Sequence, residues 1–168
     1  MTAGAIRRGA EISPCGKYRY ALWRIWDETE PLVLFVGLNP STADATQDDP
    51  TLRSCIRLAS RWGYGGLYMT NLFAYRSTDP TQIEQVDDPI GPENDRWIKR
   101  LLEYVSEIVV CWGGIKQRKH LDRDKLVLEL LGDRVMCLGL TKDKAPRHPL
   151  FLKAEETELQ PFKLFPQL

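Results

Sequence analysis

Candidate chemistry in this sequence begins at Asn39, which follows the apolar run 32–38 and stands directly before Pro40. A proline disfavours the helical conformation for the preceding residue, so Asn39 is expected to be extended, with its side chain held in a restricted direction. The amide has both a donor and an acceptor and could orient a water molecule, although it cannot act as a useful base. The alternative interpretation is an Asx turn that only shapes the loop.

Asn71 and His148 are the other two candidates for chemistry. Asn71 lies in the apolar segment 67–73, where a buried amide must find partners, either in a neighbouring loop or on the hydrogen-bonding edge of a ligand. His148 lies in a loop and could donate to a developing anion or move a proton near neutral pH, unless it is a plain surface residue. The second histidine, His120, lies in a basic run and is expected to be solvated.

Aspartates crowd the loop that follows Asn39, at positions 44, 48 and 49. Asp48 or Asp49 is expected to cap a helix that begins at Pro50. Asp49 is also a candidate catalytic side chain, with Asp44 as a second. Three acids in one loop could hold a magnesium ion. However, none of the four cysteines forms a CxxC pair, and we expect neither a metal nor a cofactor.

Short apolar segments alternate with amphipathic helical patterns along the chain, and these elements must position the candidate side chains. The aromatic segment 18–26 favours an antiparallel edge strand. Strands are predicted at 32–38, 67–73, 108–112 and 135–140, and helices after Pro50, near Thr81, after Pro92 and at 125–131. Such alternation is typical of α/β proteins. We therefore expect a single domain over residues 1–168, with its core at 18–152, in a three-layer α/β/α fold around a mainly parallel four-stranded core sheet.

Ligands of parallel sheets bind beyond the carboxyl ends of the strands, and the unusual polar residues of this chain follow those ends. We therefore expect Asn39, Asn71, Trp112 and His148 to line one pocket. Catalytic roles are predicted for Asn39, His148 and Asp49. The predicted substrate-binding residues are Gly37, Leu38, Pro40, Ser41, Thr42, Asn71, Tyr75, Arg76, Trp112, Gly113, Thr141 and Arg147.

Charge and hydropathy narrow the classes of partner. The 23 basic residues equal the 23 acidic ones, so the basic excess typical of proteins that grip duplex nucleic acid is missing, although local basic runs lie at 116–125 and 142–148. No apolar run approaches the ~20 residues that span a bilayer. The N-terminal segment lacks the apolar stretch of a secretory signal. We therefore expect a cytoplasmic protein without a membrane partner.

The chain resembles a family of uncharacterised bacterial and phage proteins over residues 18–152. This resemblance rests on six blocks in order, FVGLNPSTAD, DDPTLRSC, WGYGGLYMTNLFAYRSTDP, DDPIGPEND, VVCWGG and CLGLTKDKAPRHPLFL. The layout more distantly resembles the uracil-DNA glycosylase superfamily, whose mismatch-specific branch has a GINPG motif similar to GLNPS here.

The glycosylase resemblance implies a fold and a role for each candidate. It implies a uracil-DNA-glycosylase-like α/β/α fold, in which Asn39 would position the attacking water and Asn71 would pair with a flipped base. The loop 148–150 would grip DNA and the leaving base, although Leu150 stands where that superfamily usually has serine.

Four functions stay open on the sequence alone. The first is an enzyme directed at a nucleobase or nucleotide, an N-glycosidic hydrolase in which Asn39 orients water and His148 assists the leaving group. The second is a base-modifying transferase on the same fold, and the third is a non-catalytic module that binds nucleic acid or a nucleotide. A metal-dependent hydrolase, supported only by the acidic loop, is a fourth option. The expected partner in the first three is nucleic acid or a nucleotide.

Overall fold

The computed structural model describes residues 7–163 of the 168-residue chain. Its strands are β1 (Arg7–Ile12), β2 (Arg19–Ile25), β3 (Leu32–Gly37), β4 (Gly66–Asn71), β5 (Glu107–Val110), β6 (Val135–Cys137) and β7 (Gln160–Pro161). Its α-helices are α1 (Pro50–Arg61), α2 (Asn94–Leu101) and α3 (Arg123–Leu131). Short 3-10 helices are η1 (Pro80–Glu84), η2 (Arg118–His120) and η3 (Ala154–Glu156).

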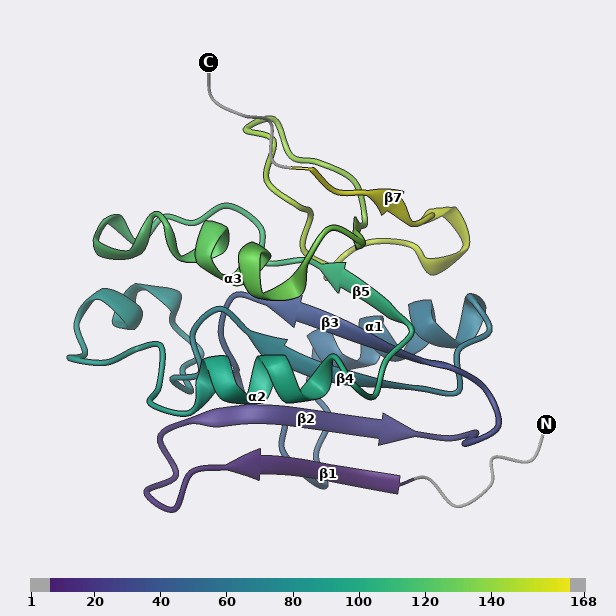
Figure 1. The fold of residues 1–168 in the computed structure, drawn as a ribbon, viewed down its shortest axis with the longest axis horizontal. Helices are drawn as coiled ribbons and strands as arrows, with labels where there is room; N and C mark the ends of the chain where they lie inside the picture. Colours follow the sequence, from purple (N-terminus) through teal and green to yellow (C-terminus); the bar gives the residue numbers. More distant parts are fainter. Residues whose placement is uncertain (1–6, 164–168) are drawn as a thin grey trace.

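The strands form one seven-stranded sheet in the order β1-β2-β4-β3-β5-β6-β7 (Figure 1). The pairings β3–β4, β3–β5 and β5–β6 are parallel, whereas β1–β2, β2–β4 and β6–β7 are antiparallel. The predicted fold class, a mainly parallel four-stranded core sheet of the uracil-DNA-glycosylase kind, is therefore wrong. The sheet is mixed, and antiparallel strands extend it on both sides.

The missed strands have a physical explanation. An outer strand pairs on one side only and needs no apolar run, so the polar sequence RRGAEI of β1 gave no strand signal. The outer strand at the other side, β7, contains only Gln160 and Pro161. The aromatic strand β2 was expected at an edge, but it lies between β1 and β4.

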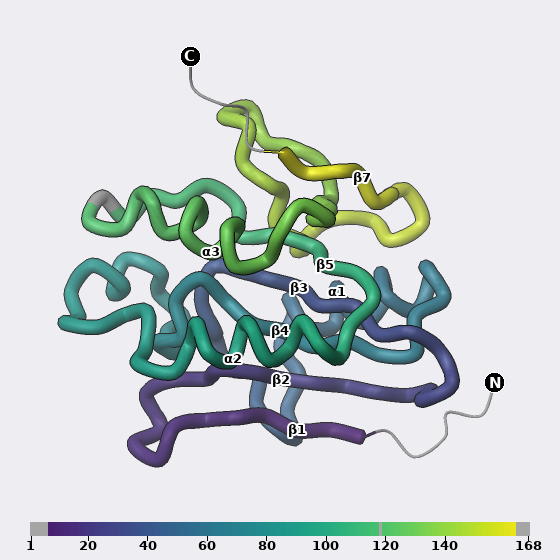
Figure 2. The backbone as a smooth tube through the Cα atoms, viewed as in Figure 1, coloured from purple at the N-terminus to yellow at the C-terminus, as the bar shows by residue number. Residues whose placement is uncertain are grey.

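Helices pack on both faces of the sheet because successive side chains of a strand point to opposite faces. Leu34 and Val36 of β3 join the apolar cluster that contains Ile98 of α2 and Val127 of α3. On the other face, Val33 and Phe35 join Leu52, Cys55 and Leu58 of α1. Figure 2 shows α2 and α3 on the near side of the sheet and α1 on the far side.

The helix α1 begins where the sequence predicts a helix start. The Asp49 side chain accepts a hydrogen bond from the backbone N–H of Leu52 (2.8 Å), and Pro50 occupies the first turn, where its missing N–H costs nothing. Among residues 7–163, no helix has both the length and the apolar composition to cross a membrane.

Candidate functional site

A pocket of about 150 Å³ lies at the sheet edge where the parallel strands β3, β4 and β5 end. Because β2 runs antiparallel to β4, it contributes its first residue, Arg19, to the same edge. The residues that line the pocket are Arg19, Gly37, Leu38, Asn39, Ser41, Asp49, Thr51, Met69, Asn71, Pro80, Cys111, Trp112, His148 and Pro149.

The pocket brings together part of the predicted site. The predicted residues that line it are Gly37, Leu38, Asn39, Ser41, Asp49, Asn71, Trp112 and His148. The predicted residues outside its lining are Pro40, Thr42, Tyr75, Arg76, Gly113, Thr141 and Arg147. Asn39, Asn71, Trp112 and His148, which were expected to share a pocket, all line this one.

The Asn39 side chain is fixed by its nitrogen. Nδ2 donates to the carbonyl oxygens of Pro40 (3.0 Å) and Ser77 (2.8 Å). A carbonyl can only accept, so these contacts define which end of the amide is nitrogen. They also differ from an Asx turn, in which the side-chain oxygen accepts from the backbone. Among the residues that the structure describes, Oδ1 has no donor, so it can accept from a ligand or a water molecule.

The Asn71 side chain is oriented in the opposite sense. Its Oδ1 accepts from an Nη2 hydrogen of Arg19 (3.3 Å), while Nδ2 has no acceptor within the described part of the chain. Asn71 is only 3% exposed, so the protein covers nearly all of this residue. The residue opposite it in the parallel pairing is Gly37, where a Cβ atom would lie 2.9 Å from Nδ2. The pocket therefore offers a fixed donor at Asn71 and a fixed acceptor at Asn39.

His148 lies in the loop after β6, and the residue as a whole is exposed. Its Nδ1 accepts from the backbone N–H of Leu150 (3.1 Å), so the proton of the neutral ring is on Nε2. Partial burial of the imidazole lowers the pKa of His148 below its usual value, and the charge of Asp49 opposes this shift. At neutral pH the ring is therefore uncharged and presents an Nε2–H donor.

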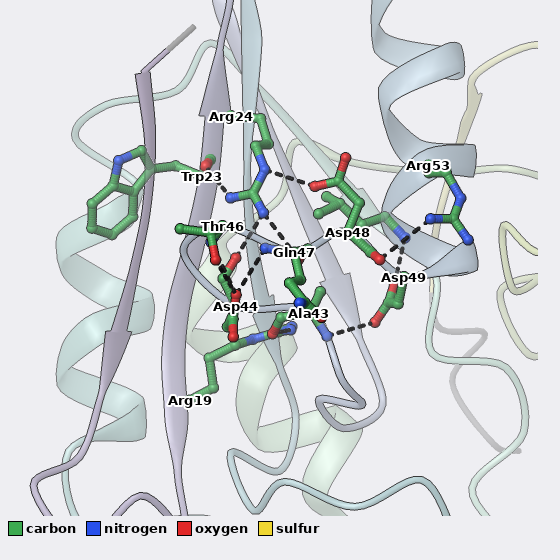
Figure 3. A network of polar contacts seen from close by, with 11 residues as sticks. Arg19, Trp23, Arg24, Ala43, Asp44, Thr46, Gln47, Asp48, Asp49 and Arg53 are labelled. Atoms are coloured by element: carbon green, nitrogen blue, oxygen red, sulfur yellow. Dashed lines mark hydrogen bonds and ion pairs between the residues drawn. The ribbon is translucent and has the colours of Figure 1, made fainter.

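The aspartates of the acidic loop bind backbone N–H groups of that loop and the side chain of Arg24 (Figure 3). Asp49 is buried, and its second oxygen accepts from the N–H of Ala43 (3.2 Å). Asp44 accepts from the N–H groups of Thr46 and Gln47, and these bonds lower the pKa of Asp44. Asp48 pairs with Arg24 (2.9 Å). No group of three or more His, Cys, Asp or Glu side chains within residues 7–163 is arranged to hold a metal ion.

Arg19 is the charged pocket residue that the sequence analysis did not predict. It is 3% exposed, and it donates from Nη1 to the carbonyl of Ala43 (3.0 Å) and from Nη2 to Asn71. Burial lowers the pKa of Arg19 to about 10, so the side chain stays charged at neutral pH. The sequence does contain an indication of this role. Arg19 lies among the aromatic residues of YRYALWRIW, and burying a charged residue in an apolar strand is costly unless another group binds it.

Cys111 also lines the pocket and was not among the predicted site residues. Burial raises the pKa of Cys111 to about 12. Its sulfur is therefore a thiol at neutral pH, and a thiol is a poor nucleophile.

The predicted residues outside the pocket shape loops around it. The Thr141 hydroxyl accepts from the N–H of Ala145 (3.2 Å), and Gly113 donates its N–H to Pro146 (2.8 Å). The N–H of Arg147 donates to Gly139 (2.9 Å). These contacts hold the segment 139–147 against the end of β5 and so place His148 at the pocket.

The other predicted residues outside the pocket contact neighbouring loops or lie within the loop after β3. Tyr75 packs edge-on against Tyr18, with ring centroids 6.2 Å apart. Arg76 donates from Nη1 to Gly16 (3.3 Å). Pro40 is buried and gives its carbonyl to the Asn39 amide, whereas Thr42 is exposed.

Residues 19–150 match a family described as "Protein of unknown function (DUF1643)". The chain belongs to this family. The predicted membership of a family of uncharacterised proteins is thus confirmed, and the segment that matches the DUF1643 family includes Arg19, Asn39, Asn71 and His148. No curated protein matches the chain. No solved structure matches it either, so the glycosylase likeness has no support beyond the residues quoted for it.

Proposed function

We propose that the protein is an enzyme that hydrolyses the N-glycosidic bond of a nucleobase in nucleic acid or a nucleotide. The observation that carries this proposal is the pairing of a fixed acceptor, Oδ1 of Asn39, with a fixed donor, Nδ2 of Asn71, in one small pocket. Enzymes that act on a base bind its polar edge in a closely fitting pocket, and Nδ2 of Asn71 can donate to an acceptor on that edge. Oδ1 of Asn39 is then left to accept from the attacking water.

The pocket suits a single planar ring. Its volume of about 150 Å³ lies below the ~300 Å³ at the lower end of common small-molecule sites. The buried ring of Trp112 forms part of the wall, held edge-on by Phe162 at 6.2 Å between centroids. An aromatic wall favours a flat, polarisable ligand.

The chemical roles follow from the free atoms. Oδ1 of Asn39 accepts a hydrogen bond from water and aims its oxygen at the sugar carbon. As the bond between this carbon and the base breaks, its electron pair moves onto the base. The Nε2–H of neutral His148 then donates to the negative charge that develops there. Asp49 is the carboxylate in the pocket lining, and both of its oxygens accept from backbone N–H groups. Orientation by Asn39, rather than proton removal by Asp49, is therefore the main way in which the pocket activates the water.

Phe151 favours a nucleic-acid strand over a free nucleotide as the substrate. It follows His148 in the same loop, is 93% exposed and has a left-handed backbone conformation (φ 69°). An exposed aromatic side chain beside the pocket could enter the gap that an extruded base leaves in a duplex.

The decisive experiment incubates the protein with single- and double-stranded oligonucleotides that contain uracil, hypoxanthine or hydroxymethyluracil. Abasic sites are then detected by alkaline cleavage. We expect wild-type protein to form abasic sites and Asn39→Ala to lose roughly 100-fold in rate, because the water is no longer oriented. Gln85→Ala, which removes an exposed amide outside the pocket, is the control and should match wild type.

Two other outcomes correspond to the transferase and to the non-catalytic module, which the sequence also leaves open. An altered base of unchanged linkage, found by mass analysis of the product, would indicate a transferase. Binding of oligonucleotides without any product, with wild type and Asn39→Ala alike, would indicate a non-catalytic module and refute the hydrolase.

A further inference from the structure

The structure describes three buried arginine side chains, Arg19, Arg24 and Arg123. Arg24 pairs with Asp48 at 2.9 Å, and Arg123 pairs with Asp95. Arg19 differs from both, because within residues 7–163 no carboxylate oxygen lies within 4.0 Å of its guanidinium. Buried charges in proteins are usually paired, so the exception needs an explanation.

The contacts of Arg19 do not neutralise its charge. Its two hydrogen-bond acceptors, the Ala43 carbonyl and the Asn71 amide oxygen, are both neutral, and its Nε has no acceptor. The charge of Asp49 acts on Arg19 from further away and is opposed by Arg76 and Arg24. Within residues 7–163 the guanidinium is therefore a buried cation that no carboxylate contacts directly.

The position of Arg19 places its charge at the pocket. Arg19 lines the pocket, beside Nδ2 of the 3% exposed Asn71. Among the described residues this Nδ2 has no acceptor, so a ligand in the pocket can supply one together with a negative charge.

We propose that the ligand of this pocket binds as an anion whose negative charge lies beside Arg19, and that Arg19 selects acidic rings over neutral ones. The identity of that anion rests on the proposed function: it is the leaving nucleobase. When the bond between the sugar carbon and the ring nitrogen breaks, both electrons stay on the nitrogen and spread to the ring carbonyl oxygens. The water oxygen bonds to the sugar carbon and releases its proton to solvent, so the base leaves with one negative charge.

The test measures binding of uracil, 5-fluorouracil and 5-nitrouracil, a series of similar shape and rising acidity, by calorimetry at pH 7.5. The neutral control ligand is 1,3-dimethyluracil, which cannot ionise. We expect affinity to rise along the series by about tenfold or more, since ionisation supplies the counter-ion that a low-dielectric site lacks. Arg19→Gln should flatten the series.

Two further variants separate a loss of ligand preference from a loss of folding. Asn71→Asp places a carboxylate against Arg19, so the unliganded protein should melt at a higher temperature while its preference for the acidic bases disappears. Arg24→Gln removes the buried arginine that already has a carboxylate partner, so it should lower stability and keep the preference.

The outcomes separate this proposal from the proposed function. A series that rises with acidity but no abasic sites from any oligonucleotide would support the anion subsite and refute the hydrolase. Abasic sites with a flat series in wild type, or with a slope that Arg19→Gln and Asn71→Asp leave unchanged, would overturn the subsite and keep the hydrolase. If neither the acidic uracils nor inorganic phosphate or formate binds, the subsite is also overturned.

Discussion

Two asparagines in one pocket present opposite hydrogen-bonding groups, an acceptor at Asn39 and a donor at Asn71. The Asn39 side-chain nitrogen donates to two backbone carbonyls, and its oxygen has no protein donor among the described residues. The Asn71 side-chain oxygen accepts from Arg19, and its nitrogen has no protein acceptor there. An amide that is free to turn would accept either a donor or an acceptor. Because each amide is held by these contacts, the pocket presents one acceptor, at Asn39, and one donor, at Asn71, in set positions.

At the scale of single residues, His148 gives a prediction about pH. Its pKa lies below the usual value, so the unfolded chain takes up a proton before the folded protein does as the pH falls. The stability that the neutral ring contributes is therefore present above pH ~6.5 and decreases as the pH falls below it. Melting temperatures measured from pH 7.5 to 5 should fall more steeply for wild type than for His148→Gln.

The same variant has a kinetic signature. Loss of the Nε2–H donor should lower the rate of abasic-site formation about 100-fold. Wild-type activity should persist to below pH 6.5 because the ring stays neutral there. A wild-type rate that increases as the ring becomes protonated would contradict the neutral-donor role.

At the scale of elements, side chains of α2 and α3 hold the end of β4 by hydrogen bonds to backbone carbonyls there. Asn94 of α2 donates from Nδ2 to the carbonyls of Asn71 (3.0 Å) and Leu72 (3.1 Å), and Arg123 of α3 donates to Leu72 (2.9 Å). The neighbouring strand β3 contributes Gly37, which is level with Asn71 in the parallel pairing. The backbone of Asn71 is thus held by α2, and the neighbouring position on β3, Gly37, has no side chain that would cover the Asn71 amide.

Gly37→Ala tests this arrangement. The added Cβ would lie 2.9 Å from Nδ2 of Asn71, and the amide is the part that can move. We expect a small loss of stability, about 1 kcal/mol, together with a roughly tenfold loss of affinity for the acidic uracils because the donor is displaced. Gly114→Ala is the control, since a Cβ there meets nothing within 4 Å. An unchanged affinity in Gly37→Ala would show that Asn71 does not contact the ligand.

At the scale of the whole molecule, the last described segment is tied back to the middle of the chain. Arg61 at the end of α1 donates to the carbonyls of Thr157 (3.1 Å) and Glu155 (2.9 Å), and the Trp62 indole donates to Thr157 (3.3 Å). This tie fixes the chain beyond the pocket loop, which runs from β6 through His148 to η3.

Arg61→Ala should therefore lower stability by about 1 kcal/mol, or roughly 2–4 °C in melting temperature for a chain of this size. Its ion pair with Glu158 is exposed and adds little. Binding of the acidic uracils should be retained, because Arg61 does not line the pocket. Arg53→Ala, on the same helix and exposed, should melt within a degree of wild type, about the effect of an ordinary surface substitution; an equal loss in both variants would refute the tie.

The sequence predicted the lining of the pocket better than the topology of the sheet. Residues such as Asn39 and Trp112 could be located because each follows a buried apolar strand, and strand ends meet at one edge of a parallel sheet. The free atoms of the two amides could not be predicted, because they depend on Ser77 and Arg19, which are distant in the sequence. The strands β1 and β7 escaped prediction because outer strands need no apolar period. The place of Thr141 outside the pocket lining could not be predicted, because a turn hydroxyl and a binding hydroxyl have the same residue type.

The outer strands also bear on how the protein behaves at high concentration. With a formal net charge of zero, copies of the chain repel one another little at long range. Strand-to-strand aggregation then depends on what the two sheet edges offer. One edge, β1, carries the exposed charges of Arg7, Arg8 and Glu11, and the other, β7, is two residues long and ends in a proline that has no N–H to donate. Both edges are poor templates for another strand, which favours a monodisperse protein despite its balanced charge.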